Sequence, residues 1–273
     1  MTKSKTNEIL VIMLAFALAA LFLFPILWII FSSFKAGEEL FELPARMIPR
    51  HFSLANYVEA LRYGNFFRYS LNSFFIAVVA TGVTLVINSL AGYSLAKLRF
   101  TGRHLFFLLL MSAAMVPGES ILYGSLEVVI NLGLYDNYLA LILASAATPT
   151  GVFMLRQFFS YIPNEYLEAA RMEGLGEFRI FWIMLPLAKS VLATLAIFSF
   201  MWRWNDLIFP LMVIASPDKY TVQIGIANLI GEYRVDWHRL IASSTLSMLP
   251  MIIIFFMFQR YLMNYNLDSG IKG

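Results

Sequence analysis

Long apolar stretches dominate the chain, and polar or charged segments separate them. A helix that crosses the hydrocarbon core of a bilayer needs about 20 mainly apolar residues. Six such stretches cover residues 9–34, 69–96, 105–128, 137–155, 180–202 and 240–259. The first is longer than the apolar core of about 7–15 residues in a cleaved signal peptide, so we expect it to remain as a span. The pattern predicts an all-α integral membrane protein with six transmembrane helices in a single transmembrane domain, residues 1–273.

Positive charge in the short loops indicates how these helices are oriented. The loop 97–104 carries Lys97, Arg99 and Arg103, whereas the loop 119–136 has no lysine or arginine. Short loops rich in lysine and arginine stay in the cytoplasm. Because an even number of spans puts both ends of the chain on one side, we expect both termini in the cytoplasm.

The segment 156–186 differs from the other connections because it is polar, favours helix and lies on the expected cytoplasmic side. Its first helix is expected to end at Gly174, and a second is expected to begin at Glu177. Acidic residues flank the small pair Ala169 and Ala170, which allows another surface to approach closely. The pattern predicts two short helices that form a docking surface, and an ordinary amphipathic connection is the alternative.

Composition narrows the classes of function. Of the 273 residues, 60% are hydrophobic and 14% are charged, whereas an average soluble domain has about 25% charged residues. This composition excludes a soluble enzyme, a disordered chain and a nucleic-acid-binding protein, and it implies contact with membrane lipid. The net charge of +3 is mild and spread along the chain, so no nucleic-acid partner is expected.

Residues that could carry chemistry are sparse. The sequence has no cysteine, and its three histidines lie far apart in loops, so no metal site is expected. It has no phosphate-binding loop motif, so we expect no phosphate-binding or ATP-hydrolysing site within this chain. Within the apolar stretches, the ionisable candidates for chemistry are Glu119 and Lys189, and both lie near helix breaks or ends. An intramembrane enzyme is therefore the weaker hypothesis.

One constellation in the segment 156–186 resembles a known family. Its parts are Glu168-Ala169-Ala170, Gly174 and Ile183-Met184-Leu185-Pro186, and they are similar to the EAA loop of the permeases of binding-protein-dependent ABC importers. Flanking sequences extend the resemblance to the carbohydrate-uptake branch, and in particular to its maltose-transporter-type second permease. These sequences are Pro117-Gly118-Glu119, Leu155-Arg156-Gln157-Phe158-Phe159, Trp204-Asn205-Asp206 and Gln259-Arg260-Tyr261. One departure is that eight residues separate Gly174 from Ile183, one fewer than in the family pattern.

The resemblance implies a type I ABC importer permease fold with cytoplasmic coupling helices. It implies a second permease subunit in a heterodimer, two ABC ATPase subunits and an extracellular solute-binding protein as partners. The expected location is the cytoplasmic membrane of a bacterium or an archaeon. No cofactor is expected in this chain, because ATP and Mg would be bound by the partner ATPase. The ATPase-coupling residues that the resemblance implies are Glu168, Ala169, Ala170, Arg171, Gly174, Leu185 and Pro186.

Two further sites are expected outside the coupling segment. Helix breakers and polar residues mark a candidate substrate pathway. Its residues are Pro117, Gly118, Glu119, Trp204, Asn205 and Asp206. The external loop before the sixth stretch carries aromatic and arginine side chains, which are favoured as interface anchors. Docking of the binding protein is expected there, at Tyr233, Arg234 and Trp237, and an interfacial loop at headgroup level is the alternative.

The sequence says less about the transported solute than about the fold. The resemblance implies a sugar, an oligosaccharide or a polyol. One alternative keeps the architecture and imports a glycerol-phosphate-type or peptide solute, and a second is a standalone secondary carrier. Polar residues within the apolar stretches, such as Thr84 and Asn88, either line a pathway or join helices to one another.

Overall fold

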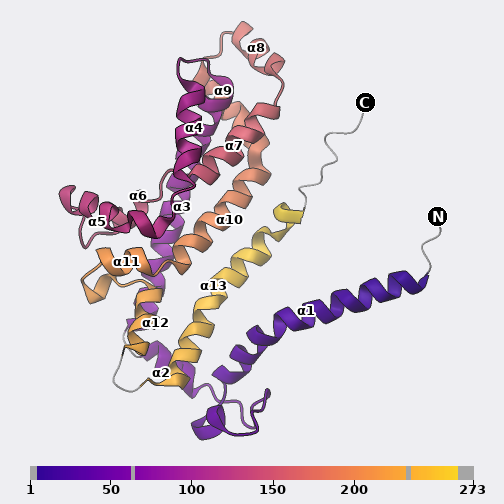
Figure 1. Ribbon diagram of the computed structural model, residues 1–273, viewed down its shortest axis with the longest axis vertical. Helices are drawn as coiled ribbons and strands as arrows, with labels where there is room; N and C mark the ends of the chain where they lie inside the picture. The colour runs from indigo at the N-terminus through magenta and orange to yellow at the C-terminus, as the bar shows by residue number, and fades with distance from the viewer. Residues whose placement is uncertain (1–4, 63–64, 232–234, 264–273) are drawn as a thin grey trace. The chain divides into compact units, whose positions relative to one another are not determined.

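The computed structural model describes residues 5–62, 65–231 and 235–263, and it consists of helices joined by short connections (Figure 1). The elements are α1 (Lys5–Ser33), η1 (Gly37–Phe41), α2 (Ala55–Arg62), α3 (Phe66–Lys97), α4 (Arg103–Ala113), η3 (Gly118–Ile121), α5 (Leu122–Asn131), α6 (Tyr138–Leu143), α7 (Pro149–Tyr161), α8 (Asn164–Met172), α9 (Glu177–Met184), η4 (Leu185–Ala188), α10 (Lys189–Asn205), α11 (Ile208–Val213), η5 (Pro217–Lys219), α12 (Val222–Ile230) and α13 (Trp237–Met263). These described residues contain no strand, so the all-α prediction is confirmed.

Four helical segments of the described chain are long and apolar enough to cross a membrane. They are Asn7–Ser33, Phe66–Lys97, Glu177–Asn205 and Trp237–Gln259, and their mean hydropathy lies between 2.0 and 2.9. They correspond to the first, second, fifth and sixth apolar stretches of the sequence. The most apolar segment of Asn7–Ser33 is exposed along its whole length, as expected for a helix that faces lipid.

The third apolar stretch forms two helical pieces. The axis bends by 100° between Arg103–Ala113 and Gly118–Asn131. Pro117 lies at this bend, and a proline cannot continue a helix because it lacks the backbone N–H. The helix break expected at Pro117 and Gly118 is therefore confirmed. The two pieces are long and apolar enough for a fifth crossing if they count as one span.

The fourth apolar stretch is also interrupted. Residues 144–148 are not helical, and they separate α6 from α7. The two helices have 6 and 13 residues, and each is shorter than the about 20 residues that a crossing needs. Thr148 caps α7, because its Oγ1 accepts a hydrogen bond from the N–H of Gly151 at 3.2 Å. The count of six spans therefore stays a prediction.

The chain divides into two compact units, and the first comprises residues 1–67 and 225–249. Here the end of α1 is fixed to α2. The side-chain amide of Asn56 donates to the carbonyl oxygens of Ser33 and Lys35, at 2.9 and 2.7 Å. The ring of Tyr57 packs on Phe34 with 5.1 Å between centroids. These contacts fix the direction in which the chain leaves α1.

The second unit comprises residues 68–224 and 250–273 and has two hydrophobic cores along α3. The core near the end of α3 joins it to α7, α8, α9 and α10, and it includes Tyr93, Leu155, Phe159, Leu167, Ile180 and Met184. The other core joins the first half of α3 to α5, α6 and α11, and it includes Ile76, Ala80, Val129, Ala140 and Val213. The helix α3 is thus the common support of both groups of elements.

At Gly92 the helices α3 and α7 approach each other closely. A Cβ atom added there would lie 2.8 Å from the Cβ of Leu155 and 2.9 Å from the backbone nitrogen of Arg156. Small residues permit such close packing of helices in membranes. Glycine at this position lets α3 and α7 lie in backbone contact.

Candidate functional site

The helices α8 and α9 form a hairpin, defined here as residues 164–184, which lies at one end of the second unit (Figure 1). On α8 the side chain of Leu167 is buried in the core, whereas Glu168 and Ala169 are exposed. On α9 the buried residues are Ile180, Phe181 and Met184. One face of the hairpin is therefore packed, and the other presents acidic and small side chains.

The turn of the hairpin requires glycine. Gly174 has φ +78°, in the left-handed region that favours glycine. Its N–H donates to the oxygen of Arg171 at 2.9 Å, and the N–H of Leu175 donates to the oxygen of Ala170 at 3.1 Å. This pair of bonds closes the end of α8. The helix end that the sequence predicted at Gly174 is confirmed.

Polar contacts attach the hairpin to the end of α3. Glu177 accepts hydrogen bonds from Nε of Arg171 at 2.8 Å and from the hydroxyl of Tyr93 at 3.2 Å. The Glu177 carboxylate raises the pKa of Arg171, through this hydrogen bond above all. The ammonium group of Lys97 donates to Oδ1 of Asn164 at 2.9 Å. The hairpin is therefore fixed at both helix starts.

The expected coupling residues fall on two elements. Glu168, Ala169, Ala170 and Arg171 lie on α8, and Gly174 lies two residues after the end of this helix. Leu185 and Pro186 lie beyond α9, in η4, where Leu185 is half-buried and Pro186 is exposed. The sequence analysis named Glu177 only as the start of the second short helix and missed its contacts, although an acidic residue three positions after Gly174 is a signal that could have found them.

A buried polar cluster surrounds Arg203 in the last turn of α10. Its guanidinium donates to Thr84 Oγ1 and to the carbonyl oxygen of Ser145, both at 2.6 Å. It also donates to Oγ of Ser199 at 2.6 Å and to the oxygen of that residue at 3.0 Å. The fifth apolar stretch was predicted to end at residue 202, but the helix continues to Asn205, so Arg203 belongs to α10.

The break between α6 and α7 lies against polar side chains of α3. The amide of Asn88, which is fully buried, donates to the carbonyl oxygen of Ala146 at 3.3 Å and accepts from the N–H of Thr148 at 2.9 Å. Non-helical backbone is tolerated at membrane depth only where such groups are satisfied. Of the two roles open for Thr84 and Asn88, the joining of elements is confirmed.

A cavity of about 180 Å³ lies beside this cluster. Its polar lining residues are Ser73, Ser125, Ser145, Arg203, Asp206 and Thr221. Gly118 also lines it, so the structure brings Gly118 and Asp206 of the expected pathway together. Pro117, Glu119, Trp204 and Asn205 do not line it. Trp204 is instead buried against the ring of Phe200, with 5.7 Å between centroids.

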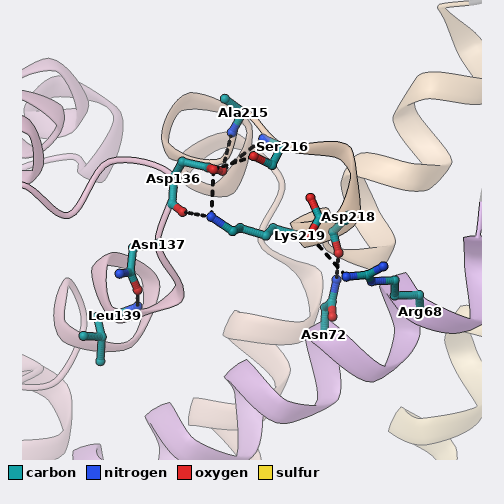
Figure 2. A network of polar contacts seen from close by, with 9 residues as sticks. All are labelled: Arg68, Asn72, Asp136, Asn137, Leu139, Ala215, Ser216, Asp218 and Lys219. Atoms are coloured by element: carbon teal, nitrogen blue, oxygen red, sulfur yellow. Dashed lines mark hydrogen bonds and ion pairs between the residues drawn. The ribbon is translucent and has the colours of Figure 1, made fainter.

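A second polar network joins the connection before α6 to the segment before α12 (Figure 2). The carboxylate of Asp136 accepts hydrogen bonds from the N–H groups of Ala215 and Ser216, at 3.0 Å each, and from Lys219 Nζ at 2.8 Å. Lys219 and Ser216, which donate to the carboxylate, hold the pKa of Asp136 well below its usual range. The network fixes the segment that leads to Thr221.

The same segment is attached to α3 on its other side. The amide of Asn72 donates to the carbonyl oxygens of Asp218 and Tyr220, at 3.0 and 2.9 Å (Figure 2). Arg68 forms an ion pair with Asp218 at 3.1 Å. The chain between η5 and α12 is therefore held from two directions.

The expected docking residues are only partly described. Trp237 is the first residue of α13 and is exposed. Tyr233 and Arg234 lie outside the described residues, as does the tail 264–273. The described part of the chain contains no group of three or more acidic, histidine or cysteine residues that could hold a metal ion.

Known proteins resemble this chain over most of its length. It is 36% identical over 281 residues to the arabinooligosaccharides transport system permease protein AraQ of Halalkalibacterium halodurans, with 99% of this chain and 100% of that protein covered. It is 32% identical over 258 residues to the sn-glycerol-3-phosphate transport system permease protein UgpE of Yersinia pestis, with 91% and 92% covered. Each relative is named as a transport system permease.

The fold also has a solved counterpart. The crystal structure of a bacterial ABC transporter involved in the import of the acidic polysaccharide alginate contains a similar chain, with a TM-score of 0.84. The two are 24% identical, and 96% of this chain and 99% of that chain are covered. Residues 9–264 match the family described as binding-protein-dependent transport system inner membrane component. The chain belongs to this family of transport permeases, as the EAA-like segment indicated.

Proposed function

We propose that this chain is one of two permease subunits of an ATP-driven importer for a sugar or an oligosaccharide. The observation that carries the proposal is the hairpin 164–184, which exposes Glu168 and Ala169 and is fixed to α3. A rigid, exposed element with acidic and small side chains is suited to docking on a separate ATPase. Family membership supports this assignment, because the family is the membrane component of a transport system.

Energy and solute would both reach the chain through partners. Two ABC ATPase subunits would bind ATP and Mg and would move the hairpin, and an extracellular binding protein would deliver the solute. A second permease would complete the pathway, because the chain has exposed apolar surface and its described spans number four or five. In this role the chain is not itself catalytic.

The proposed orientation follows the distribution of positive charge. The hairpin and both termini would lie in the cytoplasm, and the connection containing Asp136 would lie outside. Lys97 is the last residue of α3 and Arg103 is the first residue of α4. Both support this assignment, since positively charged residues in short loops stay on the cytoplasmic side. The membrane would be the cytoplasmic membrane of a bacterium or an archaeon.

The nature of the cargo rests on the relatives. The similarity to a permease for arabinooligosaccharides favours a neutral saccharide. The similarity to a permease for sn-glycerol-3-phosphate supports a second candidate of a different charge. The two candidates differ in charge, because sn-glycerol-3-phosphate is an anion and a saccharide of this kind is neutral. The lining of a solute site must match this charge.

Docking of the binding protein is proposed at Tyr233, Arg234 and Trp237. Reversal of charge in Arg234→Glu should raise the concentration of binding protein needed for half-maximal ATPase stimulation. An unchanged titration curve for Arg234→Glu combined with Tyr233→Ala would move the docking site to the loop 35–68.

Reconstituted transport tests the proposal. The complex of both permeases and the ATPases is placed in proteoliposomes with the binding protein, and uptake of labelled arabinotriose, maltotriose and sn-glycerol-3-phosphate is measured. ATP-dependent uptake of a sugar that also needs the binding protein is expected. Uptake without ATP would indicate a secondary carrier, and uptake of sn-glycerol-3-phosphate alone would favour the second candidate.

A further inference from the structure

The cavity beside Arg203 lies where two interrupted helical segments meet. Gly118 and Ser125 belong to the bent segment η3–α5, and Ser145 belongs to the break between α6 and α7. Irregular backbone within a membrane occurs where it lines a cavity or is buried in protein. Interrupted helices around a polar cavity are a strong indication of a solute site in a transport protein.

The charge of the lining is balanced. Arg203 contributes one positive charge and Asp206 one negative charge, and among the described residues no other ionisable side chain lines the cavity. The terminal guanidinium nitrogens of Arg203 already donate to oxygens of Thr84, Ser145 and Ser199. An anion would therefore meet a guanidinium whose terminal N–H groups are already used and the like charge of Asp206. Binding of an anion is unfavourable in these surroundings. A neutral solute suits this lining.

The hydroxyl groups of the lining leave both donors and acceptors available. Ser73 Oγ accepts from the N–H of Val222 at 2.8 Å, which leaves its O–H free to donate. Ser125 Oγ donates to the oxygen of Ile121 at 2.9 Å, which leaves its lone pairs free to accept. A sugar hydroxyl donates and accepts at once and can use both kinds of group. A phosphate ester offers mainly acceptors, so it can use the free O–H of Ser73 but not the lone pairs of Ser125.

The remaining lining and the size restrict the solute further. Ile76, Leu141 and Phe209 are apolar and suit the C–H face of a ring. The volume of about 180 Å³ is below the about 300 Å³ at which ligand pockets usually begin. A cavity of this size limits the solute to at most one ring of an oligosaccharide.

We infer that this cavity is a solute subsite of the permease that binds one neutral, hydroxylated ring, with Asp206, Ser73 and Ser125 as its polar contacts. The inference rests on the proposed importer function and deepens it, because it names the residues and the chemical class of the solute. The subsite would receive the solute after its release from the binding protein.

Equilibrium dialysis tests the subsite on the purified complex of both permeases and the ATPases, without the binding protein. The probes are labelled arabinotriose and, separately, maltotriose, with sn-glycerol-3-phosphate as competitor. Ser125→Leu fills the cavity and should weaken sugar binding at least about tenfold. The matched control is Ser112→Leu on α4, an exposed serine that does not line the cavity and should bind as the wild type does.

A change of charge tests the chemical class. Asp206→Asn removes the acidic group, so sugar affinity should fall about tenfold or more and sn-glycerol-3-phosphate should begin to compete. Competition by sn-glycerol-3-phosphate in the wild type would overturn the neutral class. Equal sugar binding by Ser125→Leu and Ser112→Leu, or no saturable binding in a complex that imports sugar with its binding protein, would overturn the subsite and leave the importer function intact. A complex that imports no sugar would instead overturn the proposed function.

Discussion

At the scale of single residues, Glu177 joins both helices of the hairpin to Tyr93 of α3 through two polar contacts. The variant Glu177→Gln removes the ion pair with Arg171 and weakens the hydrogen bond from Tyr93. Because the ion pair is partly exposed, we expect a cost of about 1 kcal/mol or less in stability. The ATPase stimulation by loaded binding protein should fall several-fold, because α8 loses the ion pair that joins it to the start of α9. Glu173→Gln, an exposed change in the same turn, is the control, and an equal effect of both variants would contradict the role of Glu177.

Asp136 should make the stability of the second unit depend on pH. Its folded pKa lies below that of the unfolded chain, which is about 4. The carboxylate therefore stabilises the fold above about pH 4, and this contribution is lost as the pH falls further. Asp136→Asn should lower the free energy of unfolding by about 2 kcal/mol at neutral pH, and the difference from the wild type should shrink in acid.

The variant Asn is chosen at this position because Asp136 has φ +56°, a conformation that asparagine tolerates. Asp218→Asn, which removes a largely exposed ion pair with Arg68, serves as the comparison and should cost less. Thermal unfolding in detergent between neutral and acidic pH measures both variants. A pH-independent loss for Asp136→Asn would show that the ionised carboxylate is not what stabilises this connection.

The role of a single residue could be predicted from the sequence where it depends on neighbours along the chain. It could not be predicted where it depends on partners that are distant in sequence. The conformation of Gly174 follows from its place at the end of a helical pattern. Arg203 could not be interpreted in the same way, because a charge at the end of an apolar stretch usually lies at the interface. Its guanidinium is instead bonded within the protein to Thr84 and Ser145, which are remote in sequence.

At the scale of elements, the contact between α3 and α7 should tolerate no side chain at Gly92. Gly92→Ala places a methyl group within 2.8 Å of the Cβ of Leu155, so the helices must separate. We expect a loss of about 1–3 kcal/mol in stability and less assembled complex in the membrane. Gly82→Ala on the same helix meets nothing within 4 Å and should be neutral or slightly stabilising. Equal amounts of complex for the two variants would contradict the close approach.

Helix boundaries in the apolar stretches were only partly predictable. The long helices α1, α3 and α13 follow from uninterrupted apolar sequence, and the bend before η3 follows from Pro117. The break between α6 and α7 has a weaker local signal. Pro149 suits the first turn of a helix, so it is compatible with the start of α7 but does not by itself show that the preceding residues leave the helix. Asn88 of α3 stabilises the break, so a tertiary contact decides the structure there.

At the scale of the whole molecule, the proposed topology can be measured directly because the chain has no cysteine. Single cysteines are introduced as Glu173→Cys in the turn of the hairpin and as Glu127→Cys on α5, where both side chains are exposed. A membrane-impermeant maleimide added to intact cells should label the second variant alone. Labelling of Glu173→Cys from outside would overturn the proposed orientation.

The central claim is that the hairpin 164–184 transmits the work of a separate ATPase to the permease. The most direct test is the stimulation of ATP hydrolysis by loaded binding protein in proteoliposomes that contain the whole importer. Glu168→Lys reverses the charge of the exposed face, and Gly174→Pro is incompatible with φ +78°, so each should abolish stimulation while the chain is still inserted. Glu8→Lys, the same charge change on the exposed start of α1, should keep it. Wild-type stimulation by both hairpin variants, at normal amounts in the membrane, would contradict the account.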